Sequence, residues 1–341
     1  MVKARTSLLI LFIAVIIALP VVSAHVPNFP EGNDSLDTAL HIDDPAKSIV
    51  VYANLHHHDE AQYYSFHIEQ DERIYLGLLI PINSEEGYVP SFVLMGPGLG
   101  EVGELPPFIE RPEDAGYIVI EGMLPELGEY EGFSPSGFYE LGGIDMNAPA
   151  EGEFYVAAYT EEGEGNYGLV IGYVESFTII EFIRVPLDLI VVYQWEGQSL
   201  LEILSPFIIT FMIGLILMIY GMRKRGLEVP TYGLVGAIAG LFFLGSSAIM
   251  LYQMLYVLNQ VPVNSQIIIT LMFTLVPLIM GIAIIRIGLM GSRKPSRGMR
   301  ATMFIIGILA LFVWAGYFIG PALAIIAALL PVSIASRIIR I

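Results

Sequence analysis

An uninterrupted apolar stretch from Ile203 to Met222 is the feature that most constrains this chain. It holds about 20 residues without a charge, and Arg223, Lys224 and Arg225 follow it directly. At a rise of 1.5 Å per residue, a helix of this length crosses the roughly 30 Å hydrocarbon core of a bilayer. The basic triplet predicts that this end of the helix stays in the cytoplasm. The sequence therefore predicts a membrane protein divided in two at this helix.

Charge is distributed unevenly between the two parts. Residues 25 to 200 contain 32 acidic but only four basic residues, so they carry a net charge of −28. The other 12 basic residues lie near the ends of apolar segments or in short loops, which is the pattern of cytoplasmic loops in membrane proteins. We therefore expect an acidic extracytoplasmic domain, which would repel nucleic acid and anionic lipid.

The first residues predict a secretory signal peptide over 1–24. Lys3 and Arg5 precede an apolar run from Leu8 to Leu19, and small residues follow where a signal peptidase cuts. Cleavage at that point would make His25 the new N-terminus.

Residues 25–175 predict an antiparallel β-sandwich. Short apolar or alternating runs are separated by glycine, proline, asparagine and acidic clusters, without helical periodicity. The expected strands are Ser48 to Ala53, Gln62 to Ile68, Ile74 to Ile80, Ser91 to Met95, Tyr117 to Ile120, Glu153 to Tyr159 and Tyr167 to Tyr173. Alternation in the second strand directs Tyr64, Phe66 and Ile68 towards the core and His67 away from it.

Several motifs in this part resemble a known family. Asp37-Thr38-Ala39, His57 to Phe66 and Asp71 to Ile74 resemble the opening of the bacterial pre-peptidase C-terminal (PPC) domain. The later strands of that domain are similar to Ser91 to Pro97, Gly152 to Tyr159 and Gly165 to Leu169. The related GOLD sandwich describes them equally well. The resemblance implies a non-catalytic β-sandwich of the kind appended to secreted proteins, some of which bind calcium or polymers.

Two segments have no clear place in this sandwich. The acidic insertion from Gly98 to Gly143 is long for a loop, which is typical of a binding element or of disorder, and its aromatic residues favour order. Residues 176–202 carry too many charges to span a membrane. They predict a last strand or an interfacial segment, with Tyr193 and Trp195 at the level of the lipid headgroups.

The second part of the chain predicts a bundle of five transmembrane helices. The expected spans are 203–222, 232–258, 267–285, 301–318 and 322–338, the last two forming a hairpin at Gly320-Pro321. This arrangement leaves the N-terminal domain outside and the C-terminus in the cytoplasm. Four spans, with the C-terminus outside, are the alternative. We expect Gly236 and Gly240 to let helices pack closely, either within the bundle or in a homo-oligomer.

No catalytic motif supports an enzyme. The chain lacks the P-loop, the G-x-S-x-G and H-E-x-x-H motifs and the kinase signatures, and it contains no cysteine for thiol catalysis. The interiors of the predicted spans are uncharged, which argues against proton-coupled transport and intramembrane proteolysis. We therefore expect no catalytic residues.

Histidine provides the candidate metal ligands. His56-His57-His58 lie on a predicted turn, where alternation directs His56 and His58 to one side. With the amine and ring of a new N-terminal His25, they could bind copper, since neutral imidazole suits that metal. A solvated turn is the alternative. The acidic turns at Asp34 to Asp44 and Glu161 to Glu164 are candidates for calcium but lack the spacing of an EF-hand.

The sequence thus favours a non-catalytic multi-pass membrane protein whose sandwich binds a ligand, a partner protein or a component of the cell envelope. Copper handling through the three histidines is one alternative, and calcium is the other candidate cofactor. A transport component is the second alternative, and it requires five polar residues of the spans to line one path: Ser246, Ser247, Gln253, Thr270 and Thr274.

Overall fold

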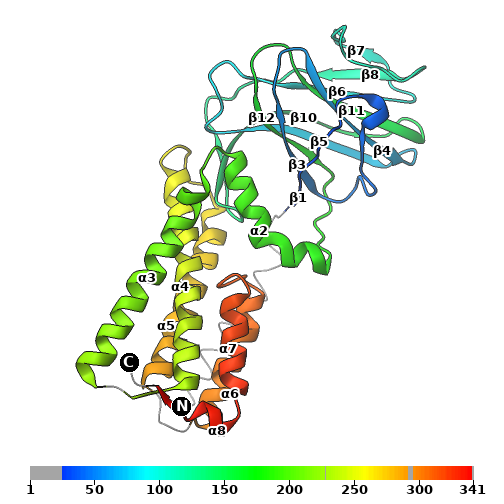
Figure 1. The fold of residues 1–341 in the computed structure, drawn as a ribbon. Helices are drawn as coiled ribbons and strands as arrows, with labels where there is room; N and C mark the ends of the chain where they lie inside the picture. Colours follow the sequence, from blue (N-terminus) through cyan, green and yellow to red (C-terminus); the bar gives the residue numbers. More distant parts are fainter. Residues whose placement is uncertain (1–24, 227, 291–294, 340–341) are drawn as a thin grey trace.

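The computed structural model describes residues 25–226, 228–290 and 295–339. Figure 1 shows a β-domain at one end and a bundle of helices at the other, with helix α2 between them. The predicted signal peptide lies outside the described residues, as do residues 291–294 of the basic loop.

The β-domain is a sandwich of two six-stranded sheets. In the first, β1 (Val26–Asn28), β3 (Ile49–Leu55), β12 (Gly165–Ile171), β5 (Arg73–Pro81), β10 (Ser136–Asn147) and β9 (Glu129–Glu131) lie side by side in that order. The second contains β2 (Leu40–His41), β4 (Glu60–Ile68), β11 (Gly152–Thr160), β6 (Ser91–Gly96), β8 (Gly116–Ile120) and β7 (Glu101–Val102). We call them sheet A and sheet B. A short 3-10 helix, η2 (Leu36–Thr38), precedes β2.

The main core lies between the sheets and contains the residues that alternation directed inward. Tyr64, Phe66 and Ile68 are buried there, while His67 is exposed, as predicted. Tyr63 on the opposite face of β4 is buried too. A second cluster covers that face, with Ile109 among its buried residues, so sheet B is apolar on both sides.

All seven expected strands are present, but the sandwich is not purely antiparallel. The pairs β1/β3, β2/β4 and β7/β8 are parallel. The acidic insertion forms regular structure. Besides the expected strand β8, it supplies the hairpin of β9 and β10, and β10 pairs with β5 along nearly its whole length.

The segment after the sandwich forms a helix, α2 (Ile179–Trp195), so the expectation of a last strand was wrong. A capping box begins it, because Thr178 accepts from the Glu181 backbone N–H while the Glu181 carboxylate accepts from that of Thr178. The same carboxylate accepts from Lys47 Nζ at 2.7 and 2.9 Å. The start of α2 is thereby fixed to the sandwich.

Three helices of the described part are long and apolar enough to cross a membrane: α3 (Leu200–Arg225), α4 (Thr231–Leu258) and α5 (Ile267–Met290). A second capping box, Ser199 with Glu202, begins α3, and Gly226 ends it in the left-handed conformation. Much of α3 is apolar and exposed, as lipid contact requires, whereas α4 is buried along much of its length.

Five spans are not confirmed. The last two predicted spans appear as α6 (Arg297–Leu311) and α7 (Ile319–Leu329), followed by α8 (Val332–Ala335). The hairpin exists, but its turn occupies residues 312–318, ahead of Gly320-Pro321. Helices of 15 and 11 residues are about 22 and 16 Å long, which is short of the hydrocarbon core. The strands β13 (Val229–Pro230) and β14 (Ile338–Ile339) pair with each other, which joins the segment before α4 to the segment after α8.

Glycines bring α4 and α5 into backbone contact. A Cβ added at Gly233 would lie 2.2 Å from the Gly288 carbonyl oxygen, and one at Gly240 would lie 2.7 Å from the Gly281 oxygen. A Cβ added at Gly236 would instead meet a side chain, 2.7 Å from the Cε atom of Met303 of α6. Gly236 and Gly240 therefore pack inside this chain, and a homo-oligomer through them stays a prediction.

Candidate functional site at the domain junction

The β9–β10 hairpin docks on the bundle through buried hydrogen bonds. Thr270 Oγ1 on α5 donates to the Gly132 carbonyl oxygen at 2.6 Å, and Tyr130 Oη lies 2.6 Å from the same hydroxyl. Because Thr270 has one hydroxyl proton, Tyr130 must be the donor of the second bond. Asn264 Nδ2 donates to the Tyr130 carbonyl, and Gln266 Oε1 accepts from Gly132 N. The segment predicted as an insertion thus supplies buried hydrogen bonds between the sandwich and the bundle.

We expect Thr270→Val to lower the free energy of unfolding by about 3 kcal/mol, because it leaves the buried Tyr130 hydroxyl and Gly132 carbonyl without their shared partner. Thermal unfolding in detergent measures this. Thr274→Val is the matched control one turn away, since Thr274 Oγ1 is buried without a hydrogen-bond partner among the described residues. Equal losses in the two variants would contradict the assignment.

The far end of α2 is fixed to the sandwich and to the bundle. Trp195 Nε1 donates to the Ala53 carbonyl of β3 at 3.1 Å, and Asn166 Nδ2 of β12 donates to the Trp195 carbonyl. Just beyond, the side-chain amides of Gln198 and Gln253 of α4 exchange two hydrogen bonds, at 2.9 and 2.8 Å. Both amides are buried, so the pair locks the α2–α3 connection against α4.

These contacts enclose a cavity of about 170 Å³ between the outer face of sheet A, α2 and the β9–β10 hairpin. We call it the junction pocket. Its walls are mostly apolar, with Val50, Leu78, Leu79, Val170 and Phe138 on the side of sheet A and Val185, Leu189 and Val192 on α2. Its polar groups include His25, Glu131, Ser134, Ser136 and Glu196. A mainly apolar cavity with a few converging polar groups is the usual form of a small-molecule site.

Three glutamates, Glu131, Glu140 and Glu196, line the junction pocket. Glu131 accepts from the backbone N–H groups of Phe133 and Ser134, each at 2.7 Å, and from the Ser134 hydroxyl. Glu196, at the end of α2, is only 4% exposed. Burial raises its pKa to about 8, with Glu131 adding to the shift, while hydrogen bonds from Ser136 and Gln198 oppose it. At neutral pH, Glu196 is therefore mainly protonated.

The hydroxyl of Ser136 also donates to the Ser134 carbonyl oxygen. The sequence alone did not single out Glu131 or Glu196, because their place in the pocket depends on contacts between segments that are far apart in the chain.

The three predicted metal ligands lie in different surroundings. His25 lines the junction pocket, where its Nδ1 is 2.5 Å from Ser48 Oγ and burial lowers its pKa, so the ring is neutral. His56 and His58 are exposed on the turn between β3 and β4. The backbone N–H of His56 donates to Glu60 Oε2. Copper binding by these histidines stays a prediction.

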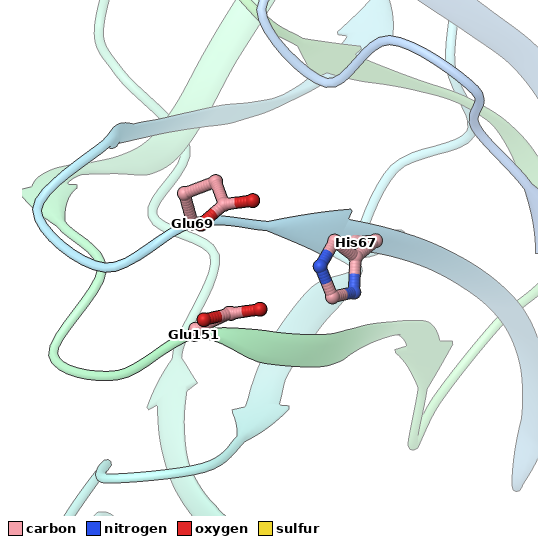
Figure 2. A group of neighbouring side chains, drawn as sticks. All are labelled: His67, Glu69 and Glu151. Atoms are coloured by element: carbon pink, nitrogen blue, oxygen red, sulfur yellow. The ribbon is translucent and has the colours of Figure 1, made fainter.

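A different group of metal-ligand side chains lies on sheet B. Figure 2 shows His67 on β4, Glu69 just after it and Glu151 just before β11, with their side chains around one space. One ligand atom from each lies within 4.8 Å of the other two. All three side chains are exposed, and such groups often gather without an ion, so the cluster alone does not define a metal site.

The five polar residues considered for a transport path are all buried in the bundle. Thr270 binds the β9–β10 hairpin, and Gln253 binds Gln198 of the α2–α3 connection. Ser247 donates to the Thr274 carbonyl, and Ser246 donates to the Phe243 carbonyl and accepts from Gly316 N. These bonds join segments of the protein, and the transport alternative stays a prediction.

The fold defines a class, a β-sandwich docked on helices that include three candidate membrane spans. No family model matches the chain, and no curated protein matches it. Among solved structures, the chain is similar to the pre-peptidase C-terminal domain of a collagenase from Bacillus anthracis. The identity is 17%, the TM-score is 0.23, and the match covers 42% of this chain and 96% of that one. Membership of the PPC family stays a prediction.

Proposed function

We propose that this protein is a non-catalytic, multi-pass membrane protein whose sandwich and helices together bind a small amphiphilic ligand in the junction pocket. The observation that carries the proposal is a cavity with apolar walls on two sides and carboxyl groups, among them the buried Glu196, on a third. A cavity of about 150 Å³ admits a molecule the size of benzene, so the junction pocket is large enough for part of a ligand.

Docking favours a binding role over that of a simple anchor. A sandwich that is only tethered needs no buried hydrogen bonds to its helices, yet Tyr130 and Gly132 of the β9–β10 hairpin both bond the Thr270 hydroxyl of α5. They keep both walls of the pocket at a fixed separation, which reduces the entropy cost of binding.

The proposed orientation places the sandwich outside the cell. Basic residues mark the opposite end of the bundle, where α3 ends with Arg223, Lys224 and Arg225 and where α6 begins with Arg297. The positive-inside rule assigns that end to the cytoplasm. The short α6–α7 hairpin would then enter from the cytoplasmic side and return, which keeps the C-terminal residues there.

Gly77→Leu tests the proposed function by filling the pocket. Gly77 lines the cavity, and a Cβ there would make only ordinary contacts with Val170, the nearest at 3.6 Å, so the larger side chain has room. We expect binding of 1-octanol to weaken about ten-fold or more, as lost apolar contact predicts. Fluorescence of Trp195, which lines the pocket, reports binding in a Trp314→Phe background in phosphatidylcholine nanodiscs.

Gly100→Leu is the matched control, because no atom lies within 4 Å of a Cβ at that exposed position. It should bind octanol as the parent protein does. Identical titrations of the Gly77 and Gly100 variants would show that octanol does not occupy the junction pocket and would contradict the proposal.

A further inference from the structure

The junction pocket shares lining residues with two other cavities. Trp195 and Glu196 also line an open polar cleft of about 400 Å³ beside Asn54 and Asn83. Phe133, Val185 and Leu189 also line an apolar cavity of about 50 Å³ that reaches Ile249 and Phe273 in the bundle. We call these three adjacent spaces, from the open polar cleft to the apolar end among the helices, the route.

The charge along this route has one sign. No lysine or arginine lines any of the three spaces, all of whose lining residues belong to the described part. Glu85 and Glu164 line the open cleft, and Glu131, Glu140 and Glu196 line the junction pocket. A cation beside Glu196 would favour its charged form over the protonated form that burial favours. Negative groups in a low-dielectric cavity attract a cation and repel an anion.

The shape of the route excludes a bare metal ion as the best ligand. Apolar walls surround the carboxyl groups, and beyond Phe133 the cavity narrows to a space lined mainly by apolar side chains. A ligand that fits has a positive head and an apolar tail. A primary ammonium group suits the head, since it has three N–H donors and can bind more than one carboxyl group at once.

We infer that the junction pocket binds the protonated amine of an amphiphile, with Glu131 and Glu196 accepting its hydrogen bonds and its alkyl chain directed past Phe133 towards the bundle. This inference rests on the proposed function and specifies its ligand class. Charge complementarity along the route and the apolar end of the route are the observations that support it.

Three ligands with the same chain and different heads test the inference: octylamine, 1-octanol and octanoate, each titrated at pH 7 by isothermal titration calorimetry into the parent protein in phosphatidylcholine nanodiscs. We expect octylamine to bind about ten-fold or more tightly than octanol, and octanoate to bind most weakly, because charge-assisted hydrogen bonds exceed neutral ones. Equal affinities for amine and alcohol would overturn the ammonium head while leaving the proposed function standing. No saturable binding of any of them would overturn both.

Variants then test which carboxyl groups bind the ammonium group. Glu131→Gln should reduce the amine-to-alcohol affinity ratio about ten-fold, and Glu196→Gln should reduce it as well. Glu126→Gln, at an exposed position outside the pocket, should keep the ratio of the parent protein. If Glu131→Gln does not fold, the ratio in Glu196→Gln and the three parent titrations still decide the question. A ratio unchanged in Glu196→Gln would overturn its role.

The amine could come from a lipid headgroup or from a soluble molecule. Nanodiscs containing phosphatidylethanolamine separate these sources. Octylamine binding that weakens about ten-fold in those discs would identify the lipid headgroup as a competitor for the pocket, and unchanged binding would support a soluble amine.

Discussion

Gly233→Ala is expected to lower the free energy of unfolding by about 3 kcal/mol or more. The added Cβ would lie 2.2 Å from the Gly288 carbonyl oxygen, and the backbone of α5 cannot rotate out of the way as a side chain can. The two helices must therefore separate. Separation also weakens the second backbone contact, between Gly240 and Gly281, two turns along the helix.

Thermal unfolding in detergent measures this effect, and we expect Tm to fall by about 5 °C or more. Gly221→Ala in α3 is the control, since no atom lies within 4 Å of a Cβ at that position and alanine favours a helix. A Gly233→Ala protein that melts with the control would show that α4 and α5 are not in backbone contact.

Glu196→Gln is expected to make the protein more stable at alkaline pH and to flatten the dependence of stability on pH. Folding raises the pKa of Glu196 from its ordinary value of 4.5 to about 8. The folded state therefore holds the proton more tightly, and its stability falls as the pH rises from 4.5 to 8. The full loss, up to about 5 kcal/mol, applies above that range.

Glutamine stays neutral throughout and can keep hydrogen bonds to Ser136 and Gln198. The variant should resemble the parent at pH 5 and exceed its stability by several kcal/mol at pH 9, as measured by thermal unfolding across that range. Glu126→Gln serves as the exposed control. A parent protein whose stability does not fall between pH 5 and pH 9 relative to Glu196→Gln would contradict a buried, protonated Glu196.

Local pattern explains the elements that the sequence predicted well. The alternation of β4 correctly assigned the directions of Phe66 and His67, because one sheet face packs on the core. Tyr63 lies on the opposite face, as alternation requires, but its burial could not be predicted from the pattern, because a distant loop covers that face of the sheet. The span at α3 needed no distant information, since its length and apolar composition are sufficient.

The missed elements depend on contacts between distant residues. Strand β10 contains Gly142 and Gly143 at a bulge, which hides its pattern, and its pairing with β5 makes it a strand. The turn at 312–318 is held by Trp314, whose Nε1 donates to the Phe182 carbonyl at 2.7 Å. By contrast, the capping box Thr178-x-x-Glu181 was a readable signal for α2.

The candidate site was harder to predict than the fold. Glu196 follows an apolar helix and looks like an ordinary solvated residue in the sequence. It is buried because the Gln198–Gln253 pair and the β9–β10 hairpin enclose it, and each of these contacts joins segments more than 50 residues apart. Glu196 shares the pocket with Glu131 and Glu140 because α2 packs on the sheet that contains the β9–β10 hairpin.

Short-range quenching of Trp195 tests the central claim most directly. Trp195 is the reporter in the Trp314→Phe protein, and 8-bromo-1-octanol carries a quencher at the end of its chain, with 1-octanol as the matched unbrominated ligand. We predict that 8-bromo-1-octanol quenches Trp195 saturably, that octanol reverses the quenching, and that Gly77→Leu abolishes it. Quenching that rises in proportion to ligand concentration, and is the same in Gly77→Leu and Gly100→Leu, would contradict a ligand site at the junction.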